Sequence, residues 1–182
     1  MAKLISKTYG EALYELAVEE NNVDEYFEEV QMLKKVLNEN KDFIKLMEHP
    51  QIVKEEKIKV METVLNGRVS KELVGFFDLI ITKGRYSEIH NILEYFVSRV
   101  KELNKIGVCY VTAAIDLDDS QKMQVEEKML QTTRYEKMEM HYDQDKGLIG
   151  GMVIQIGDRV VDSSIRTKLN KLQKQLLKIQ LG

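Results

Sequence analysis

The hydrophobic period of the sequence changes once, near Lys105, and this change constrains the fold more than any other feature. Before it, apolar residues recur every three or four positions with few β-branched runs, which is the spacing of amphipathic helices. After it, the segment 106–115 is β-branched and too apolar for a surface helix, which favours a buried strand. The sequence therefore predicts an α+β protein overall, with an N-terminal all-α bundle over residues 1–104 and a small α+β domain over 105–182.

Stop and start signals divide the first part into six short helices. Pro50 pushes His49 out of the α region and so ends a helix, Ser70 is a good N-cap, and Gly84 is a good C′ residue. The predicted core-facing stripes begin at Ile5, Val23, Phe43, Ile58, Leu73 and Ile89. Six short helices joined by short loops favour a compact antiparallel bundle.

The second part combines strands with two helices. Asp118 and the acids that follow can cap a helix to about Gln131, and the alternating residues 138–142 predict a half-buried strand. Another apolar strand is predicted over 148–156, and Gly157-Asp158 is typical of a two-residue hairpin turn. Ser163 or Ser164 can cap a last helix with an apolar stripe. We therefore expect a mixed sheet of about four strands.

Composition excludes several classes of protein. The 27 Lys and Arg against 30 Asp and Glu give a net charge of -3, which excludes a globally basic, nucleic-acid-coating protein. No window approaches the roughly 18 uncharged apolar residues that span a membrane, and the first residues lack the apolar core of a signal peptide. The single cysteine, Cys109, fits a reducing compartment. The expected location is therefore the cytosol.

The residues that usually carry chemistry are not arranged for it. His49, His90 and His141 lie far apart and without metal-ligand spacing, and Cys109 falls inside the apolar strand, where a thiol packs as a small hydrophobe. Gly147 to Gly151 is followed by a predicted strand and by no Gly-Lys-Ser or Gly-Lys-Thr, so it does not fit a phosphate-binding loop. We predict no catalytic residue, no metal site and no cofactor.

Two charged segments of the sequence each allow several interpretations. The last helix carries five cations and, from Ser163 to Gly182, no acid: Arg166, Lys168, Lys171, Lys174 and Lys178. Such a helix can lie on an anionic membrane, bind RNA phosphates, dock on a partner helix, or pack on the sheet with solvated lysines. The acidic run from Glu19 to Glu29 is either a solvated face or a docking surface for a basic partner.

Two helices are apolar on more than one face. On the fifth, Gly75, Phe76 and Leu79 fall off the stripe that begins at Leu73, and on the first, Tyr14 and Val18 fall off the main stripe. The second face can pack on another bundle helix or remain as the wall of a groove for an external amphipathic helix.

The segment from Gly147 to Leu169, GLIGGMVIQIGDRVVDSSIRTKL, resembles the C-terminal signature of the delta subunit of the bacterial F-type ATP synthase, the family of the mitochondrial oligomycin-sensitivity-conferring protein. The similarity covers the whole chain and includes Tyr9-Gly10-Glu11-Ala12-Leu13 and Lys83-Gly84-Arg85. Gly10, Asp116 and Ser163 depart from the usual Ala, Pro and Gly of the family.

The resemblance implies a non-catalytic connector in the stator stalk. In the family, the helical bundle sits on the catalytic head and holds the N-terminal helix of an alpha subunit between its first and fifth helices. On this sequence that groove would be lined by Tyr14, Val18, Gly75, Phe76 and Leu79. If Phe76 is exposed in the free protein, Phe76→Asp is expected to weaken binding to the head without unfolding the bundle. The second domain of the family binds the C-terminal ends of the paired b subunits, here near Gly150, Gly151, Ile165, Leu169, Leu172 and Leu176.

The resemblance also implies a location at the cytoplasmic face of the cell membrane, with attachment only through the complex, and no nucleic-acid partner. The alternative from another class is a soluble RNA-binding adaptor that uses the basic C-terminal helix. An enzyme built on the strand at Gly150-Gly151 is a distant third, because the sequence places no pair of acid and base or nucleophile and base.

Overall fold

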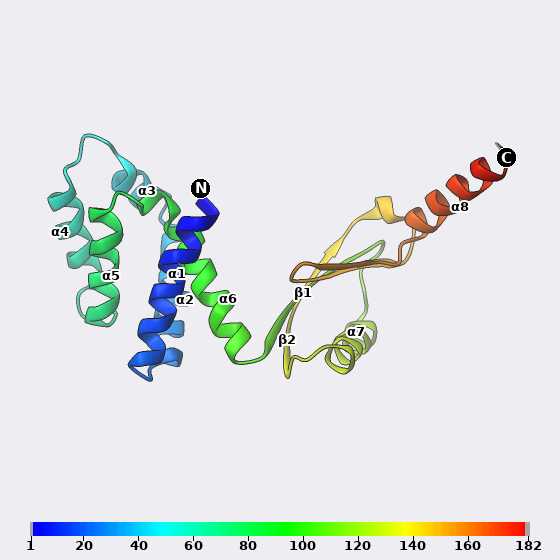
Figure 1. The fold of residues 1–182 in the computed structure, drawn as a ribbon, viewed down its shortest axis with the longest axis horizontal. Coiled ribbons are helices and arrows are strands. Elements are labelled where there is room, and N and C mark those ends of the chain that lie inside the picture. Colours follow the sequence, from blue (N-terminus) through cyan, green and yellow to red (C-terminus); the bar gives the residue numbers. More distant parts are fainter. Residues whose placement is uncertain (1, 181–182) are drawn as a thin grey trace. The chain divides into compact units, whose positions relative to one another are not determined.

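The computed structural model describes the backbone of residues 2–180 and the side-chain surroundings of residues 4–175. The chain divides into two compact units, Met1–Lys101 and Glu102–Gly182, and each is described by itself (Figure 1). The first unit contains α1 (Ala2–Glu19), α2 (Val23–Glu39), α3 (Lys41–Glu48), α4 (Lys54–Leu65), α5 (Lys71–Thr82), the 3-10 turn η1 (Tyr86–Glu88) and α6 (Ile89–Leu103). The six predicted helices are confirmed.

Local signals end these helices as expected. His49 is extended (φ -62°, ψ 125°) before Pro50, and α3 stops at Glu48. Gly84 follows α5 with φ +66°, and its amide donates to the carbonyl of Ile81 at 2.9 Å. Ser70 stands at the predicted N-cap of α5. Its side chain and amide nevertheless donate to Glu29, each at 2.7 Å, so this residue ties α5 to α2 instead of capping the helix with its hydroxyl.

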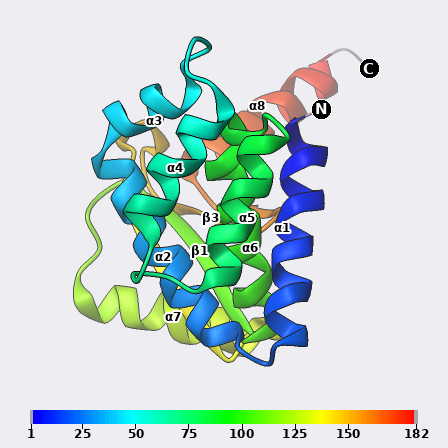
Figure 2. The ribbon, with the colours of Figure 1, turned by 90° about the vertical axis from the view of Figure 1, so that its left-hand side faces the viewer.

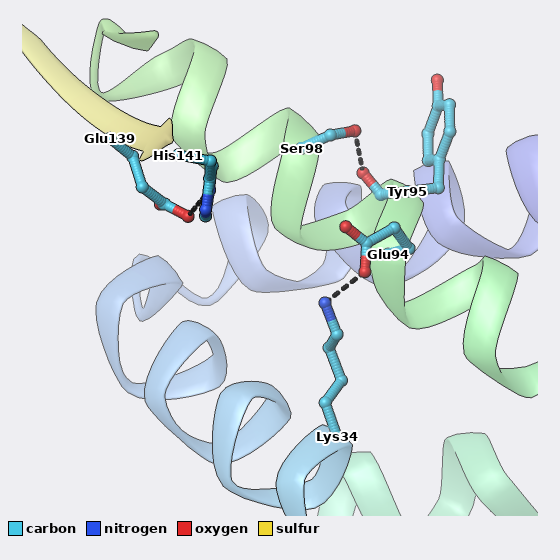
Figure 3. Close-up of polar contacts among 6 residues, drawn as sticks. All are labelled: Lys34, Glu94, Tyr95, Ser98, Glu139 and His141. Carbon is cyan, nitrogen blue, oxygen red and sulfur yellow. Dashed lines mark hydrogen bonds and ion pairs between the residues drawn. The ribbon is translucent and has the colours of Figure 1, made fainter. Parts of the chain in front are cut away.

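One apolar core joins the helices of the first unit. Tyr26, Phe77 and Phe96 are among its largest fully buried side chains, and they come from α2, α5 and α6. Figure 2 looks onto this unit with α4 and α5 in front. At the surface, Lys34 of α2 forms an ion pair with Glu94 of α6 (Figure 3). These contacts make the unit a packed helical bundle.

The second unit is a four-stranded mixed sheet with two helices. Its elements are β1 (Ile106–Ala113), α7 (Asp119–Thr132), β2 (Lys137–Gln144), the 3-10 turn η2 (Lys146–Leu148), β3 (Met152–Ile156), β4 (Arg159–Asp162) and α8 (Ile165–Gln180). The strand order is β2-β1-β3-β4. The pair β1 and β2 is parallel, with α7 as the crossover, and the other pairs are antiparallel. The predicted α+β fold class is confirmed.

The predicted strand over 148–156 is too long. Ile149 has φ +68° and Gly151 has φ +77°, and neither backbone conformation continues a strand. Lys146–Leu148 instead forms a 3-10 turn, and β3 begins at Met152. The hairpin turn is confirmed, because Ile156 pairs with Arg159 across Gly157 and Asp158.

The two faces of the sheet differ in burial. On one face, Cys109 and Val111 are buried, and Tyr142, the β2 neighbour of Val111, donates its hydroxyl to the Lys122 carbonyl of α7 at 3.1 Å. This face is therefore the one that α7 covers. On the other face, Tyr110 is exposed and stacks on His141, with ring centroids 4.8 Å apart.

The predicted cap of α7 is also confirmed. Asp118 accepts from the Gln121 amide at 2.8 Å, and the Gln121 side chain accepts from the Asp118 amide at 3.1 Å. This reciprocal pair satisfies two helix-end donors.

Candidate functional site

Three of the five residues predicted to line a groove on the helical unit are accessible. Val18 and Leu79 expose 45% and 44% of their surface, which is high for apolar side chains. Gly75 faces open space, since a Cβ added there would meet nothing within 4 Å. An apolar partner can reach all three residues on α1 and α5.

The other two are not free in the same way. Phe76 is 7% exposed and lies in the core, edge-on to Phe77 with ring centroids 6.3 Å apart. The condition that Phe76 is exposed in the free protein is not met, because Phe76 is three residues after Leu73 and so shares its buried face. Tyr14 is half-buried, with the Arg99 guanidinium of α6 over its ring at 5.0 Å.

A polar cluster between α1 and α6 holds Tyr14 and Arg99 in place. Glu11 accepts from the Tyr95 hydroxyl at 2.6 Å and from the Arg99 guanidinium at 3.1 and 3.2 Å. These hydrogen bonds lower the pKa of Glu11 below its ordinary value, and the bond from Tyr95 contributes most. The sequence carries no local signal for this cluster, because Glu11 lies more than 80 positions before Tyr95 and Arg99 in the chain.

We expect Glu11→Gln to destabilise the helical unit by about 1 kcal/mol at pH 7. The folded pKa of Glu11 is depressed, so its ionised form stabilises the fold above the unfolded value near 4.5, and this stabilisation is lost as the pH falls through the folded pKa. Urea unfolding at pH 7, 5 and 3 should show the gap between variant and wild type shrink only below about pH 4.5. A gap that stays constant down to pH 3 would contradict this role.

The start of α8 is anchored by a tight set of hydrogen bonds. The Asp162 carboxylate accepts from the Ser164 amide at 2.9 Å and from the Thr167 hydroxyl at 2.7 Å. These hydrogen bonds lower the pKa of Asp162 to about 2, and the bond from Thr167 contributes most. The Ser164 hydroxyl accepts from the Thr167 amide at 3.2 Å, which confirms Ser164 as the cap.

Gly150 and Gly151 permit a close approach between β3 and the base of α8. A Cβ on Gly150 would lie 2.6 Å from Cδ1 of Ile165, and one on Gly151 would lie 2.7 Å from the Ser163 carbonyl oxygen. The Ile165 amide donates to Gly150, and the Ser163 hydroxyl to Met152, at 2.9 and 2.8 Å. Within this chain the two glycines therefore attach α8, and a contact with a partner remains a prediction.

The apolar stripe of α8 is open along its described length. Ile165, Leu169 and Leu172 are 42%, 51% and 55% exposed, and every residue from 168 to 175 is exposed. The side chain of Leu176 lies outside the described residues. Exposed cations flank the stripe: Arg166, Lys168, Lys171 and Lys174. An amphipathic helix left open in this way is suited to dock a partner helix.

The described residues offer little for chemistry. They hold no group of three or more His, Cys, Asp or Glu side chains placed to bind a metal ion. Burial raises the pKa of the Cys109 thiol, which disfavours the nucleophilic thiolate. No described helix has the length and hydropathy to cross a membrane. Open apolar surfaces on both units are typical of a protein that binds other proteins.

Comparison with known proteins identifies the family of this chain. The family model described as ATP synthase delta (OSCP) subunit matches residues 5–176. ATP synthase subunit delta of Lachnoclostridium phytofermentans is 51% identical over 182 residues, which is 100% of both chains, and that of Acetivibrio thermocellus is 33% identical over 96% of this chain and 98% of the relative. A chain in the Toxoplasma gondii mitochondrial ATP synthase hexamer has the same fold, with a TM-score of 0.75 at 16% identity over 94% of this chain and 97% of that chain.

The chain belongs to the ATP synthase delta (OSCP) subunit family. It is a non-catalytic component of the stator stalk of an F-type ATP synthase. The resemblance carried by Gly147 to Leu169 is thereby confirmed, and the RNA-binding alternative has no support in the family match.

Proposed function

We propose that this subunit ties the catalytic head to the stalk through two separate contacts. The helical unit receives the N-terminal helix of an alpha subunit, and the α+β unit receives the C-terminal ends of the b subunits. The observation that carries the proposal is the open amphipathic stripe of α8, since an apolar face of this kind calls for a partner.

The accessible apolar residues of α1 and α5 support the first contact. Val18, Gly75 and Leu79 offer a surface against which an amphipathic helix can bury its stripe. Phe76 supports this surface from below, through the core, and Tyr14 is held beside it by Arg99. Of the predicted five residues, Val18 and Leu79 are therefore the ones we propose as direct anchors.

The chemistry of α8 supports the second contact. Its stripe repeats at four-residue and three-residue spacing through Ile165, Leu169 and Leu172, the spacing of a helix seam. The flanking cations favour a partner helix that carries acidic side chains beside its own stripe. The hydrogen-bonded base at Asp162 and Ser164 fixes the direction in which α8 leaves the sheet.

A stator must resist torque over many turnovers, so its contacts need slow dissociation. Buried apolar anchors slow dissociation more than exposed charges at a rim do. Two contacts on one chain also gain from effective concentration within the assembled complex. Through these contacts the protein would be held at the cytoplasmic face of the membrane.

The first contact is tested with a peptide of the alpha-subunit N-terminus and the full chain. Leu79→Asp is expected to weaken binding at least tenfold, because a charge would replace an apolar anchor, as would Val18→Asp. Val60→Asp on α4 is the matched control, since Val60 is 36% exposed outside the proposed surface. Isothermal titration should show the control unchanged, and equal binding by folded Leu79→Asp and Val18→Asp would refute the assignment.

A further inference from the structure

A hollow lined by both apolar and charged residues lies in the α+β unit, apart from the stripe of α8. It has a volume of about 650 Å³ and lies between the end of α7 and the β3–β4 hairpin. Its floor is formed by Ile154, Ile156 and Val161, and its wall by Met129 and Tyr135. We call it the α7–hairpin groove.

Burial falls off across the sheet toward this groove. Val111, Ile154 and Val161 are neighbours on three successive strands and point to the face that α7 covers. Val111 is 1% exposed, Ile154 is half-buried, and Val161 is 63% exposed. On this face of the sheet, α7 therefore covers β1 and β2 and leaves β3 and β4 uncovered.

The uncovered face of β3 and β4 has the width of one helix. Strands lie about 4.8 Å apart, so β3 and β4 together present a strip roughly 10 Å wide, and a helix with its side chains is about 10 Å across. An added helix beside α7 would complete a helix layer on this face of the sheet.

Charge indicates the chemistry of the occupant. Arg134 and Arg159 line the groove, against one acid, Asp158. Arg134 forms an exposed ion pair with Glu102 at 3.6 Å. Exposed pairs of this kind are weak, so another carboxylate can compete for Arg134. The occupant that fits is an amphipathic helix with acidic side chains beside its apolar stripe.

The helix α8, whether from this chain or from a second copy, does not meet that description. Its cations, Arg166, Lys168, Lys171 and Lys174, would face the arginines of the groove. Within one chain, the hydrogen bonds of Asp162 and the close contact between Gly150 and Ile165 also hold α8 at its base. These observations exclude α8 as the occupant and favour a helix of a partner protein.

We infer that the α7–hairpin groove is a second helix-docking site, and that the α+β unit holds the paired b-subunit ends at two different places, one along α8 and one in this groove. This inference rests on the proposed function, because that function supplies the b subunits as partners. A single domain has no internal two-fold symmetry, so it can contact both of two identical helices only through two unlike surfaces. The stripe of α8 and the α7–hairpin groove are two such surfaces.

The test uses adjacent valines that point to opposite faces of the same edge strand. Val161 lies in the groove, whereas Val160 pairs with Gln155 on the other face and is equally accessible, at 58%. The probe is the dimeric cytoplasmic segment of the b subunit, titrated against the full chain. Val161→Asp should weaken binding at least tenfold, and Val160→Asp should stay within about twofold of wild type. Thermal unfolding is used to check that both variants are folded.

A third variant, Leu169→Asp, separates the two sites. If both sites are used, Leu169→Asp and Val161→Asp each weaken binding and the double variant abolishes it. If Leu169→Asp weakens binding while folded Val161→Asp binds as wild type, the groove is not a docking site and the proposed function stands. If the wild-type chain does not bind the b segment at all, the proposed function fails and this inference fails with it.

Discussion

Phe76→Asp is expected to unfold the helical unit, with a loss of at least about 4 kcal/mol. Phe76 is 7% exposed and packs edge-on against Phe77 in the core. Removing a buried Phe side chain costs about 3 to 5 kcal/mol, and an unpaired buried carboxylate adds to that cost. The measurement is thermal and urea unfolding followed by circular dichroism, in which the variant should lose its helical transition or show it at much lower temperature.

Leu79→Asp is the control for this variant, because Leu79 lies three residues further on α5 and is 44% exposed. The free energy of unfolding of Leu79→Asp should lie within about 0.5 kcal/mol of the wild-type value, as is usual for surface substitutions. The pair separates folding from docking on one helix. A Phe76→Asp protein as stable as wild type would mean that Phe76 is not part of the core.

Gly151→Ala is expected to destabilise the α+β unit by about 3 kcal/mol. Gly151 has φ +77°, a conformation that costs a residue with a side chain about 1 to 2 kcal/mol. The added Cβ would also lie 2.7 Å from the Ser163 carbonyl oxygen, which is backbone and cannot simply rotate away. Relieving such overpacking costs a further 1 kcal/mol or more and should loosen the base of α8.

Gly157→Ala isolates the packing part of that loss. Gly157 also has a positive φ, +55°, but an added Cβ there would meet nothing within 4 Å. It should therefore cost only about 1 kcal/mol of strain. Hydrogen exchange of the β1 and α8 amides measures both variants, and equal protection in the two would show that the contact with Ser163 does not matter.

The change of hydrophobic period was enough to predict the order and type of the main elements. Amphipathic helices repeat their apolar residues every three or four positions, whereas strands carry short continuous or alternating apolar runs, so the two halves of the sequence differ in pattern before any tertiary contact is known. The strand predicted from Leu148 was wrong because apolar content alone does not report backbone conformation. The positive φ of Ile149 and Gly151 is set by the joint with α8, which lies later in the chain.

The candidate surfaces were predicted in part. Gly75 and Leu79 were correctly separated from the buried stripe of α5, whereas Phe76 was assigned to the wrong face. Whether an apolar face packs on another helix or stays open depends on which helices become neighbours, and one helix does not encode that. The cluster of Glu11, Tyr95 and Arg99 and the α7–hairpin groove depend in the same way on long-range packing.

The central claim is that one chain bridges head and stalk through two independent contacts. Its most direct test is co-sedimentation of purified catalytic head, lacking this subunit, with the cytoplasmic segment of the b subunit. We expect the wild-type chain to bring the two into one complex, Leu79→Asp combined with Val18→Asp to lose only the head, and Leu169→Asp combined with Leu172→Asp to lose or weaken only the b segment. A complex that forms equally well without this chain, or with both double variants, would contradict the account.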